Sequence, residues 1–137
     1  MLLFKSNKKE KEVQRAIVRL VNQHTDALHD DVRLESRVSL TAAVVVVPWE
    51  EKRYDATCAL SAVTKEFSST GASLVVSRLY SREDIVAVGM RREGAIIFFR
   101  GTVMHVDELG GGFWVLGLKF SEVIEIESHP ELKSLSI

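Results

Sequence analysis

The chain has 137 residues, of which 46% are hydrophobic and 27% are charged, and its formal net charge is −1. Such a length suits one domain whose core needs neither a disulfide nor a structural metal. The balanced charge excludes a general attraction to DNA, RNA or anionic lipid, so a bound anion must meet a local cluster of donors.

The cysteine and histidine content bears on the cellular compartment and on whether the protein binds a metal. The single cysteine, Cys58, has no second thiol and no close histidine at metal-ligand spacing, which indicates a reducing compartment and no metal site. The longest apolar run, residues 42–47, is too short to cross a membrane. We therefore expect a cytoplasmic protein that has no cofactor and catalyses no reaction, because the one thiol, Cys58, has no histidine in sequence reach to act as its base.

The first predicted element is an amphipathic helix over residues 10–28. Asn7, three residues before Glu10, is predicted to cap its start, and residues 30–31 are predicted to end it. We expect the apolar face to cover an open end of the β-structure or, alternatively, to pair with a second copy. Apolar or partly apolar residues recur every three or four positions, as on one helical face: Val13, Ala16, Ile17, Leu20, Val21, His24 and Leu28.

Strands are predicted from residue 38 onward. Residues 38–47 are rich in valine and form a first strand that Pro48 ends, because proline cannot donate to a ladder. Three further strands are predicted over residues 57–67, 72–76 and 85–90.

The strongest β-signal is the pair of segments 95–106 and 113–126, which flank a loop with three glycines at positions 110–112. Glycine readily adopts positive φ angles, so this pattern predicts a long antiparallel hairpin. A phosphate-binding loop is disfavoured because such loops lead from a strand into a helix. Ser128, three residues before Glu131, is predicted to cap a short final helix.

The connections between these strands are too short for parallel crossovers, so the fold is predicted to be mainly β, in a barrel or a sandwich. We divide the chain into an N-terminal tail and amphipathic helix over residues 1–32, a β-domain over residues 33–126, and a short C-terminal helix within residues 127–137.

Two arginines, Arg33 and Arg37, stand at the start of the β-domain. Two planar guanidinium groups side by side suit an anion with several oxygens, or the O6 and N7 edge of guanine. Taken alone, the pair is more typical of ordinary surface arginines that contact nearby carboxylates such as Asp30, Asp31 or Glu35.

Two later segments strengthen the case that the arginines belong to a binding site. The first is Ser68 and Gly71 at the end of a predicted strand, and the second is a Gly-Leu-Lys-Phe segment at 117–120 in the second arm of the hairpin. From about residue 33 to 124 this order resembles the PilZ domain family. The resemblance implies a six-stranded antiparallel β-barrel, with the N-terminal and short C-terminal helices added to it, that binds the bacterial second messenger cyclic di-GMP.

The resemblance also implies a role for each residue. Arg33 and Arg37 would hold phosphate and the guanine edges, Ser68 would hydrogen-bond the ligand, and Gly71 would let the backbone bend where a side chain would intrude. Glu66 stands where the family has Asp or Asn. Its longer carboxylate would either accept from guanine or fold back onto the arginines.

The implied function is that of a cyclic di-GMP receptor in bacterial signalling. It would pass the signal to a protein partner by ordering the loop that holds the arginines. The helix before that loop would then shift, dock or mediate a homodimer. The alternative is an adaptor whose site has degenerated, so that it contacts proteins without binding nucleotide.

Overall fold

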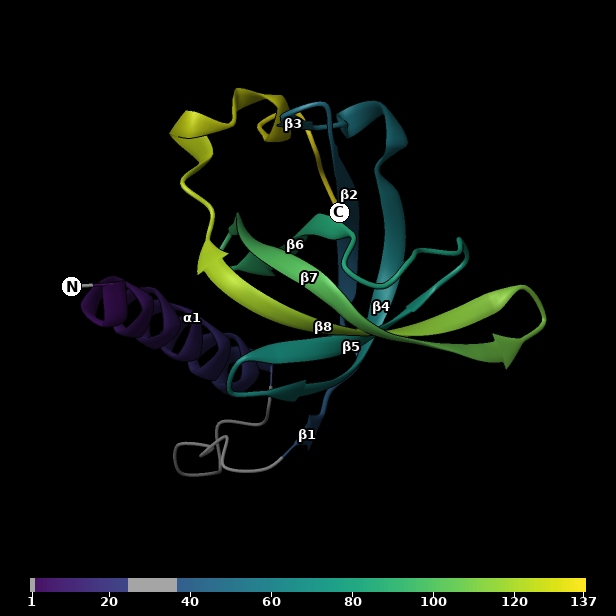
Figure 1. Cartoon of the computed structure of the whole chain (residues 1–137). Coiled ribbons are helices and arrows are strands. Elements are labelled where there is room, and N and C mark those ends of the chain that lie inside the picture. Colours follow the sequence, from purple (N-terminus) through teal and green to yellow (C-terminus); the bar gives the residue numbers. More distant parts are fainter. Residues whose placement is uncertain (1, 25–36) are drawn as a thin grey trace.

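The structure is a computed structural model that describes residues 2–24 and 37–137, with side chains from Lys8 to Gln23 and from Arg37 onward. This part of the chain folds into one α-helix followed by an antiparallel sheet of eight strands, which confirms a mainly β fold (Figure 1). The elements, in which η denotes a 3-10 helix, are α1 (Leu2–His24), β1 (Val38–Ser39), β2 (Ala43–Glu50), β3 (Arg53–Tyr54), η1 (Ala56–Cys58), β4 (Leu60–Ser68), β5 (Gly71–Val76), β6 (Ile85–Arg92), β7 (Ala95–Gly110), β8 (Phe113–Val123), η2 (Ile126–Ser128) and η3 (Pro130–Leu132).

The strands are ordered β1-β4-β5-β8-β7-β6-β2-β3, and β2 pairs with β4 as well. Pairing therefore runs from β2 through β4, β5, β8, β7 and β6 and returns to β2. The two strands beyond the predicted six have two residues each: β1 lies on β4, and β3 lies on β2.

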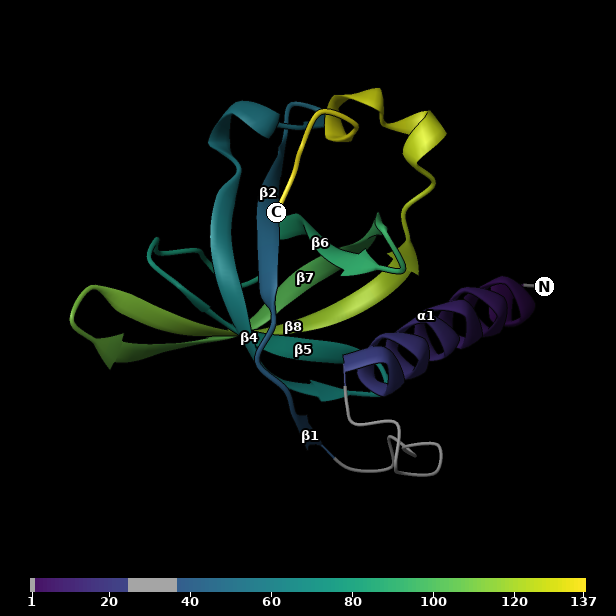
Figure 2. The same ribbon diagram turned by 180° about the vertical axis from the view of Figure 1, so that it is seen from behind.

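Helix α1 lies across one end of the strands, on the side opposite the tip of the β7–β8 hairpin (Figures 1 and 2). It packs mainly on β8 and also on β4. The predicted apolar face is confirmed for five residues, which are buried in the main core: Val13, Ala16, Ile17, Leu20 and Val21. The side chain of His24, all of Leu28 and the predicted helix end at residues 30–31 lie outside the described part.

The predicted start of this helix is wrong. The helix begins at Leu2, so Asn7 and Glu10 lie inside it instead of capping it. Residues 8–12 are all lysine or glutamate, which favour helix over a break, and this local preference extends the helix toward the N-terminus.

The predicted strand over residues 38–47 is divided, and Pro48 does not end it. Strand β2 pairs with β6 as far as Pro48, opposite Val86, and continues to Glu50. The carbonyl of Pro48 accepts a hydrogen bond from the amide of Asp55 at 2.8 Å, so the Pro48 nitrogen also points to the side of β2 on which Asp55 lies. Strand β4 pairs on this side of β2 only as far as Val46, so no ladder bond requires an N–H at Pro48.

The second predicted strand begins later than expected. Asp55 accepts a hydrogen bond from the amide of Thr57 at 3.1 Å and caps the 3-10 helix η1, which includes Cys58. Strand β4 therefore begins at Leu60 and not at residue 57. Cys58 lies in this short helix, outside the strand.

The glycine-rich hairpin is confirmed. Strands β7 and β8 pair along its length, and Gly110, Gly111 and Gly112 have φ angles of 96°, 65° and 85°. These left-handed angles disfavour other residues, so the glycines form the tip of an arm that extends from the sheet (Figure 1).

The predicted C-terminal helix is replaced by two 3-10 turns, η2 and η3. His129 precedes Pro130, and a residue before proline is disfavoured in the helical region. The φ and ψ angles of His129, −137° and 69°, are not helical, so no continuous helix forms from Ser128 to Glu131 and Ser128 does not cap one.

Within the described residues, no helix is long and apolar enough to cross a membrane.

Candidate functional site

A cavity of about 460 Å³ opens where β4 and β5 approach the β7–β8 hairpin. Three of the predicted site residues, Arg37, Glu66 and Ser68, line it together. Arg33 lies outside the described residues, and Gly71 is not part of the lining. The polar and charged lining residues are Arg37, Lys65, Glu66, Ser68, Thr70, Ser73, His105, Asp107 and Lys119.

The short strand β1 places Arg37 beside the cavity. Val38 pairs with Phe67 and Ser39 with Glu66, so the register sets Arg37 opposite Ser68. Residues 66 and 68 share one face of β4 because side chains alternate along a strand. Arg37 and Glu66 thus become diagonal neighbours on this face, and Arg37 Nη1 donates to Glu66 Oε1 at 3.0 Å.

This ion pair is one of the two arrangements expected for Glu66, the one in which it folds back onto an arginine. The Arg37 side chain is 76% exposed, whereas the Glu66 side chain is 28% exposed. The glutamate is therefore held against the sheet, while most of the guanidinium faces solvent. An exposed guanidinium remains accessible to a second anion.

A β-bulge aims Glu66 at the cavity. In the pairing of β4 with β5, Thr64 is opposite Leu74 but Glu66 is opposite Ser73, so Lys65 is an extra residue. Before the bulge, Ala62 and Thr64 point inward; after it, Phe67 does. If residues 64–66 alternated regularly, without a bulge, Glu66 would point to the same side as Thr64, toward the core. Bulges commonly redirect a side chain next to a functional site in this way.

Thr64 holds the bulge in place. Its buried hydroxyl donates to the carbonyl of Leu40 at 2.6 Å and accepts from the amide of Ala42 at 2.8 Å. The amide of Thr64 in turn donates to the carbonyl of Ala42 at 2.9 Å. The Thr64 side chain therefore joins β4 to the segment between β1 and β2, directly beside the strand that positions Arg37.

Ser68 and Gly71 form the turn between β4 and β5. The Ser68 hydroxyl accepts from the amide of Thr70 at 3.4 Å, and because it only accepts in this bond, its proton remains available to a ligand. Gly71 is needed because β5 approaches β8 closely: a Cβ atom there would meet the carbonyl oxygen of Leu118 at 2.0 Å. Its role in this structure is close strand packing.

Sequence reasoning missed the residues that the other strands contribute. Ser73 on β5 has a buried hydroxyl with no hydrogen-bond partner among the described residues. On β7, the His105 ring crosses Gly117, since a Cβ atom at 117 would lie 3.3 Å from His105 Cδ2. Lys119 on β8 adds an exposed ammonium. For Ser73 and His105 the sequence offers only a polar residue within a predicted strand, whereas Lys119 lies in the Gly-Leu-Lys-Phe segment at 117–120.

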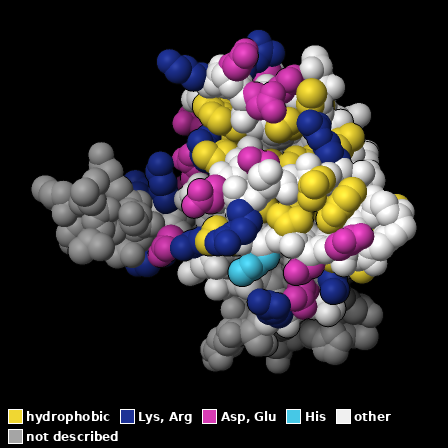
Figure 3. Space-filling model, turned by 45° about the vertical axis from the view of Figure 1, so that its right-hand side comes forward, with side chains coloured by type: hydrophobic (Ala, Val, Ile, Leu, Met, Phe, Trp, Pro, Cys, Tyr) yellow, Lys and Arg dark blue, Asp and Glu magenta, His cyan; other side chains and the backbone are white. Residues whose placement is uncertain are grey.

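The charge of the cavity is mixed. Its described lining contains three cations, Arg37, Lys65 and Lys119, and two carboxylates, Glu66 and Asp107. A space-filling view shows basic and acidic side chains interspersed, without a continuous basic surface (Figure 3). Such a site favours a compact ligand that presents both phosphates and hydrogen-bond donors over an extended polyanion. Among the described residues, no cluster of side chains suits a metal ion.

Comparisons with known proteins bear on which family the chain belongs to. No curated protein matches the chain. A crystal structure of the PilZ domain of CeSA, from a cellulose-synthesizing bacterium, is 14% identical to it, with a TM-score of 0.46 and coverage of 72% of this chain and 92% of that one. Residues 31–136 match the family model described as PilZ domain. Since this match spans most of the sequence, the chain belongs to the PilZ domain family.

Proposed function

We propose that this protein binds cyclic di-GMP in the cavity beside Arg37, Glu66 and Ser68 and that it acts as a receptor, not as an enzyme. PilZ domains are generally receptor domains for this nucleotide. The observation that carries the proposal is the convergence of Arg37, from before β1, with Glu66 and Ser68, from β4, on one cavity.

The ion pair between Arg37 and Glu66 is a weak competitor for the ligand. Exposed ion pairs contribute only about 0.2–1 kcal/mol, and most of the Arg37 side chain is in solvent. Each hydrogen bond between a guanidinium and a phosphate contributes about 1.5–3 kcal/mol. Two such bonds from Arg37 outweigh the lost pair, and Glu66 is then free to accept from guanine N1–H and N2–H.

A degenerate adaptor is the second candidate, and the same ion pair is the observation that favours it. In that case Arg37 would serve only to hold β1 against β4. The two candidates differ in what Glu66 does, so substitutions at this residue separate them.

The wider architecture fits a receptor. We propose that the ring of pairings among β2, β4, β5, β8, β7 and β6 is the six-stranded PilZ barrel, within a domain over residues 33–126. Binding would fix Arg33 and Arg37 on the nucleotide and alter the contacts that α1 makes with a protein partner or a second copy. We place this bacterial receptor in the cytoplasm.

The test is calorimetric titration of the purified protein with cyclic di-GMP. Wild type is expected to bind with micromolar affinity, Arg37→Ala to lose about tenfold or more, and Glu66→Asp to bind at least as well as wild type. Arg82→Ala, an exposed arginine outside the cavity, is the matched control. If only Glu66→Asp binds, the adaptor function replaces the receptor function; if no variant binds, the site is not a nucleotide site.

A further inference from the structure

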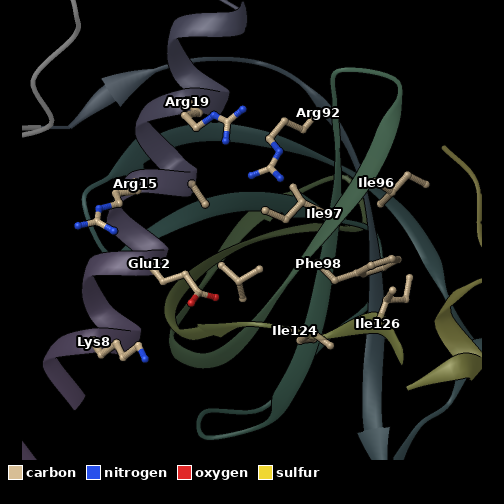
Figure 4. Close-up of a pocket in the computed structure, with 12 residues that line it drawn as sticks. Lys8, Glu12, Arg15, Arg19, Arg92, Ile96, Ile97, Phe98, Ile124 and Ile126 are labelled. Atoms are coloured by element: carbon tan, nitrogen blue, oxygen red, sulfur yellow. The ribbon is translucent and has the colours of Figure 1, made fainter. Parts of the chain in front are cut away.

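A second cavity, of about 440 Å³, lies between α1 and the beginning of β7 and shares no lining residue with the first. We call it the helix–hairpin groove. Figure 4 shows that long charged side chains of α1 line one wall and that Ile97, Phe98 and Ile124 line the other. Its two walls thus differ in chemical character.

The charged wall is basic. Lys8, Arg15 and Arg19 from α1 and Arg92 from the end of β6 line the groove, and Glu12 is the carboxylate in the described lining. Four cations and one carboxylate leave a local charge of +3, in a chain whose net charge is −1. This sign selects an anionic partner.

The carboxylates near the rim neutralise this charge only in part. Glu93 lies 3.4 Å from Arg19 Nη2, but both side chains are more than half exposed, so the contact is weak. Arg15 and Arg92 line the groove and form no ion pair with another described residue. In Figure 4 the Arg92 guanidinium extends over the groove, whereas the Arg15 guanidinium points away from the apolar wall, into solvent. Two guanidinium groups are therefore available to carboxylates of a partner.

The opposite wall and floor are aliphatic and aromatic. Ile97, Phe98 and Ile124 are buried beneath the groove, and Ile96 and Ile126 are half-buried at its surface. Covering Ile96 and Ile126 removes apolar surface from water, which contributes about 25 cal/mol per Å². A partner therefore needs apolar side chains as well as negative charge.

The groove also contains an open strand edge. The pairing of β7 with β8 ends at Phe99 and Val123, and one further bond joins the amide of Ile124 to the carbonyl of Phe98 at 2.8 Å. Beyond it the chain leaves the sheet for η2. Backbone groups two residues apart in a strand point to the same side. The N–H and C=O of Ile96 therefore point to the same side of β7 as the Phe98 carbonyl, the side of β8, and the described chain supplies no backbone partner for them there.

We propose that the helix–hairpin groove binds an extended segment of a partner protein in which acidic and aliphatic residues alternate. The segment adds a strand at Ile96, turns its aliphatic side chains onto the floor, and presents its carboxylates to Arg15 and Arg92. Adding a strand to an exposed sheet edge is a common mode of peptide recognition. The proposal specifies the partner contact of the proposed receptor, but the groove does not need the nucleotide to bind.

The test uses fluorescence anisotropy with a labelled seven-residue peptide of alternating glutamate and valine, Glu at both ends. Wild type is expected to bind it. The double variant Arg15→Glu, Arg92→Glu is expected to bind about four- to 25-fold more weakly, since each rim contact accounts for about two- to fivefold. Arg82→Glu, a charge reversal far from the groove, is expected to leave the affinity unchanged.

Two altered peptides test the remaining features. Lysine in place of glutamate should abolish binding, and N-methylation of the central peptide bonds, which blocks strand pairing but keeps the charge, should weaken it about tenfold. Equal binding of either altered peptide, or no binding by wild type at millimolar peptide, would overturn the proposal. So would arginine-dependent binding of decanoate without binding of the peptide, since this would assign the groove to a small amphiphile.

Failure of this proposal is distinguishable from failure of the receptor function. Arg37→Ala is expected to leave peptide binding unchanged, and the Arg15→Glu, Arg92→Glu variant is expected to leave the heat of cyclic di-GMP titration unchanged. The circular dichroism of each variant should match that of wild type, because all three side chains lie at the surface or rim.

Discussion

Gly71 approaches Leu118 so closely that a Cβ atom on the glycine would stand 2.0 Å from the carbonyl oxygen of the leucine. The obstacle is backbone, which cannot rotate away as a side chain can. The turn that carries Ser68 is thereby pressed against β8, which contributes Lys119 to the cavity. A small residue at position 71 thus determines how near two walls of the site lie.

Gly71→Ala is therefore expected to separate β5 from β8 and to lower the free energy of unfolding by about 1–3 kcal/mol or more. Urea denaturation measures this change. Gly117→Ala is the matched control, because a Cβ atom there meets only the side chain of His105, at 3.3 Å, and this ring can shift. Equal losses in the two variants would contradict the backbone explanation.

Thr64→Val keeps the shape of the side chain but removes the hydroxyl that bonds Leu40 and Ala42. The buried carbonyl and amide then lack this partner, which costs about 1–3 kcal/mol. We expect the urea midpoint to fall and cyclic di-GMP binding to weaken together, since the bulge that aims Glu66 loses its support. Thr41→Val, at an exposed position, should change neither; a loss of stability with unchanged binding would show that the bulge stands without Thr64.

Glu66→Gln removes the charge that pairs with Arg37 but keeps an acceptor oxygen. We expect the free energy of unfolding to change by less than about 1 kcal/mol, as for other exposed pairs. The affinity for cyclic di-GMP is expected to fall about tenfold, because the glutamine has one acceptor oxygen where the carboxylate would accept from both guanine N1–H and N2–H. Calorimetry and denaturation on one sample give both quantities. Glu93→Gln, which breaks the exposed pair with Arg19, provides the control and should leave the affinity unchanged.

The stability of the C-terminal segment should depend on pH through Glu131. Burial raises the pKa of this carboxyl, but backbone hydrogen bonds, including one from the amide of Tyr54, and the nearby His129 outweigh burial and lower it overall. A lowered pKa in the folded state stabilises the fold above the pKa of a free glutamate, about 4.3. This contribution disappears as the pH falls through the folded-state pKa.

Glu131→Gln is accordingly expected to be less stable than wild type at pH 7, with the difference shrinking as the pH falls toward 3. Urea midpoints at a series of pH values measure it. Glu127→Gln, which removes a more exposed carboxylate paired with Lys133, is the matched control at each pH. A difference between wild type and Glu131→Gln that is constant with pH would rule out the ionised carboxylate as the cause.

The features that the sequence predicts correctly are local ones. The face from Val13 to Val21 follows from spacing alone, because a helix repeats every 3.6 residues. The hairpin at Gly110 follows from the freedom of glycine to adopt positive φ. The match to the PilZ family model covers residues 31–136 and so includes the predicted β-domain, but the exact boundaries of that domain stay a prediction.

The features that it does not predict depend on distant pairings. Pro48 lies within β2 because β4 has already ended on the side that its nitrogen faces, and no nearby residue reveals this. The bulge at Lys65 is defined only by the pairing of β4 with β5, so the residues around Lys65 do not predict it. The cavity residues Ser73 and His105 come from strands that join the site through the order of the sheet, so a motif search along the chain cannot reach them.

The Thr64 contacts have a thermodynamic consequence for the site. The pairing of β2 with β4 completes the ring of strand pairings, and the Thr64 hydroxyl supports both this pairing and the bulge. Local opening of the β2–β4 pairing must therefore disrupt the cavity, so a ligand that binds only the intact cavity must also suppress the opening. Slower amide hydrogen exchange along β2, at residues that no ligand touches, then becomes a direct record of occupancy.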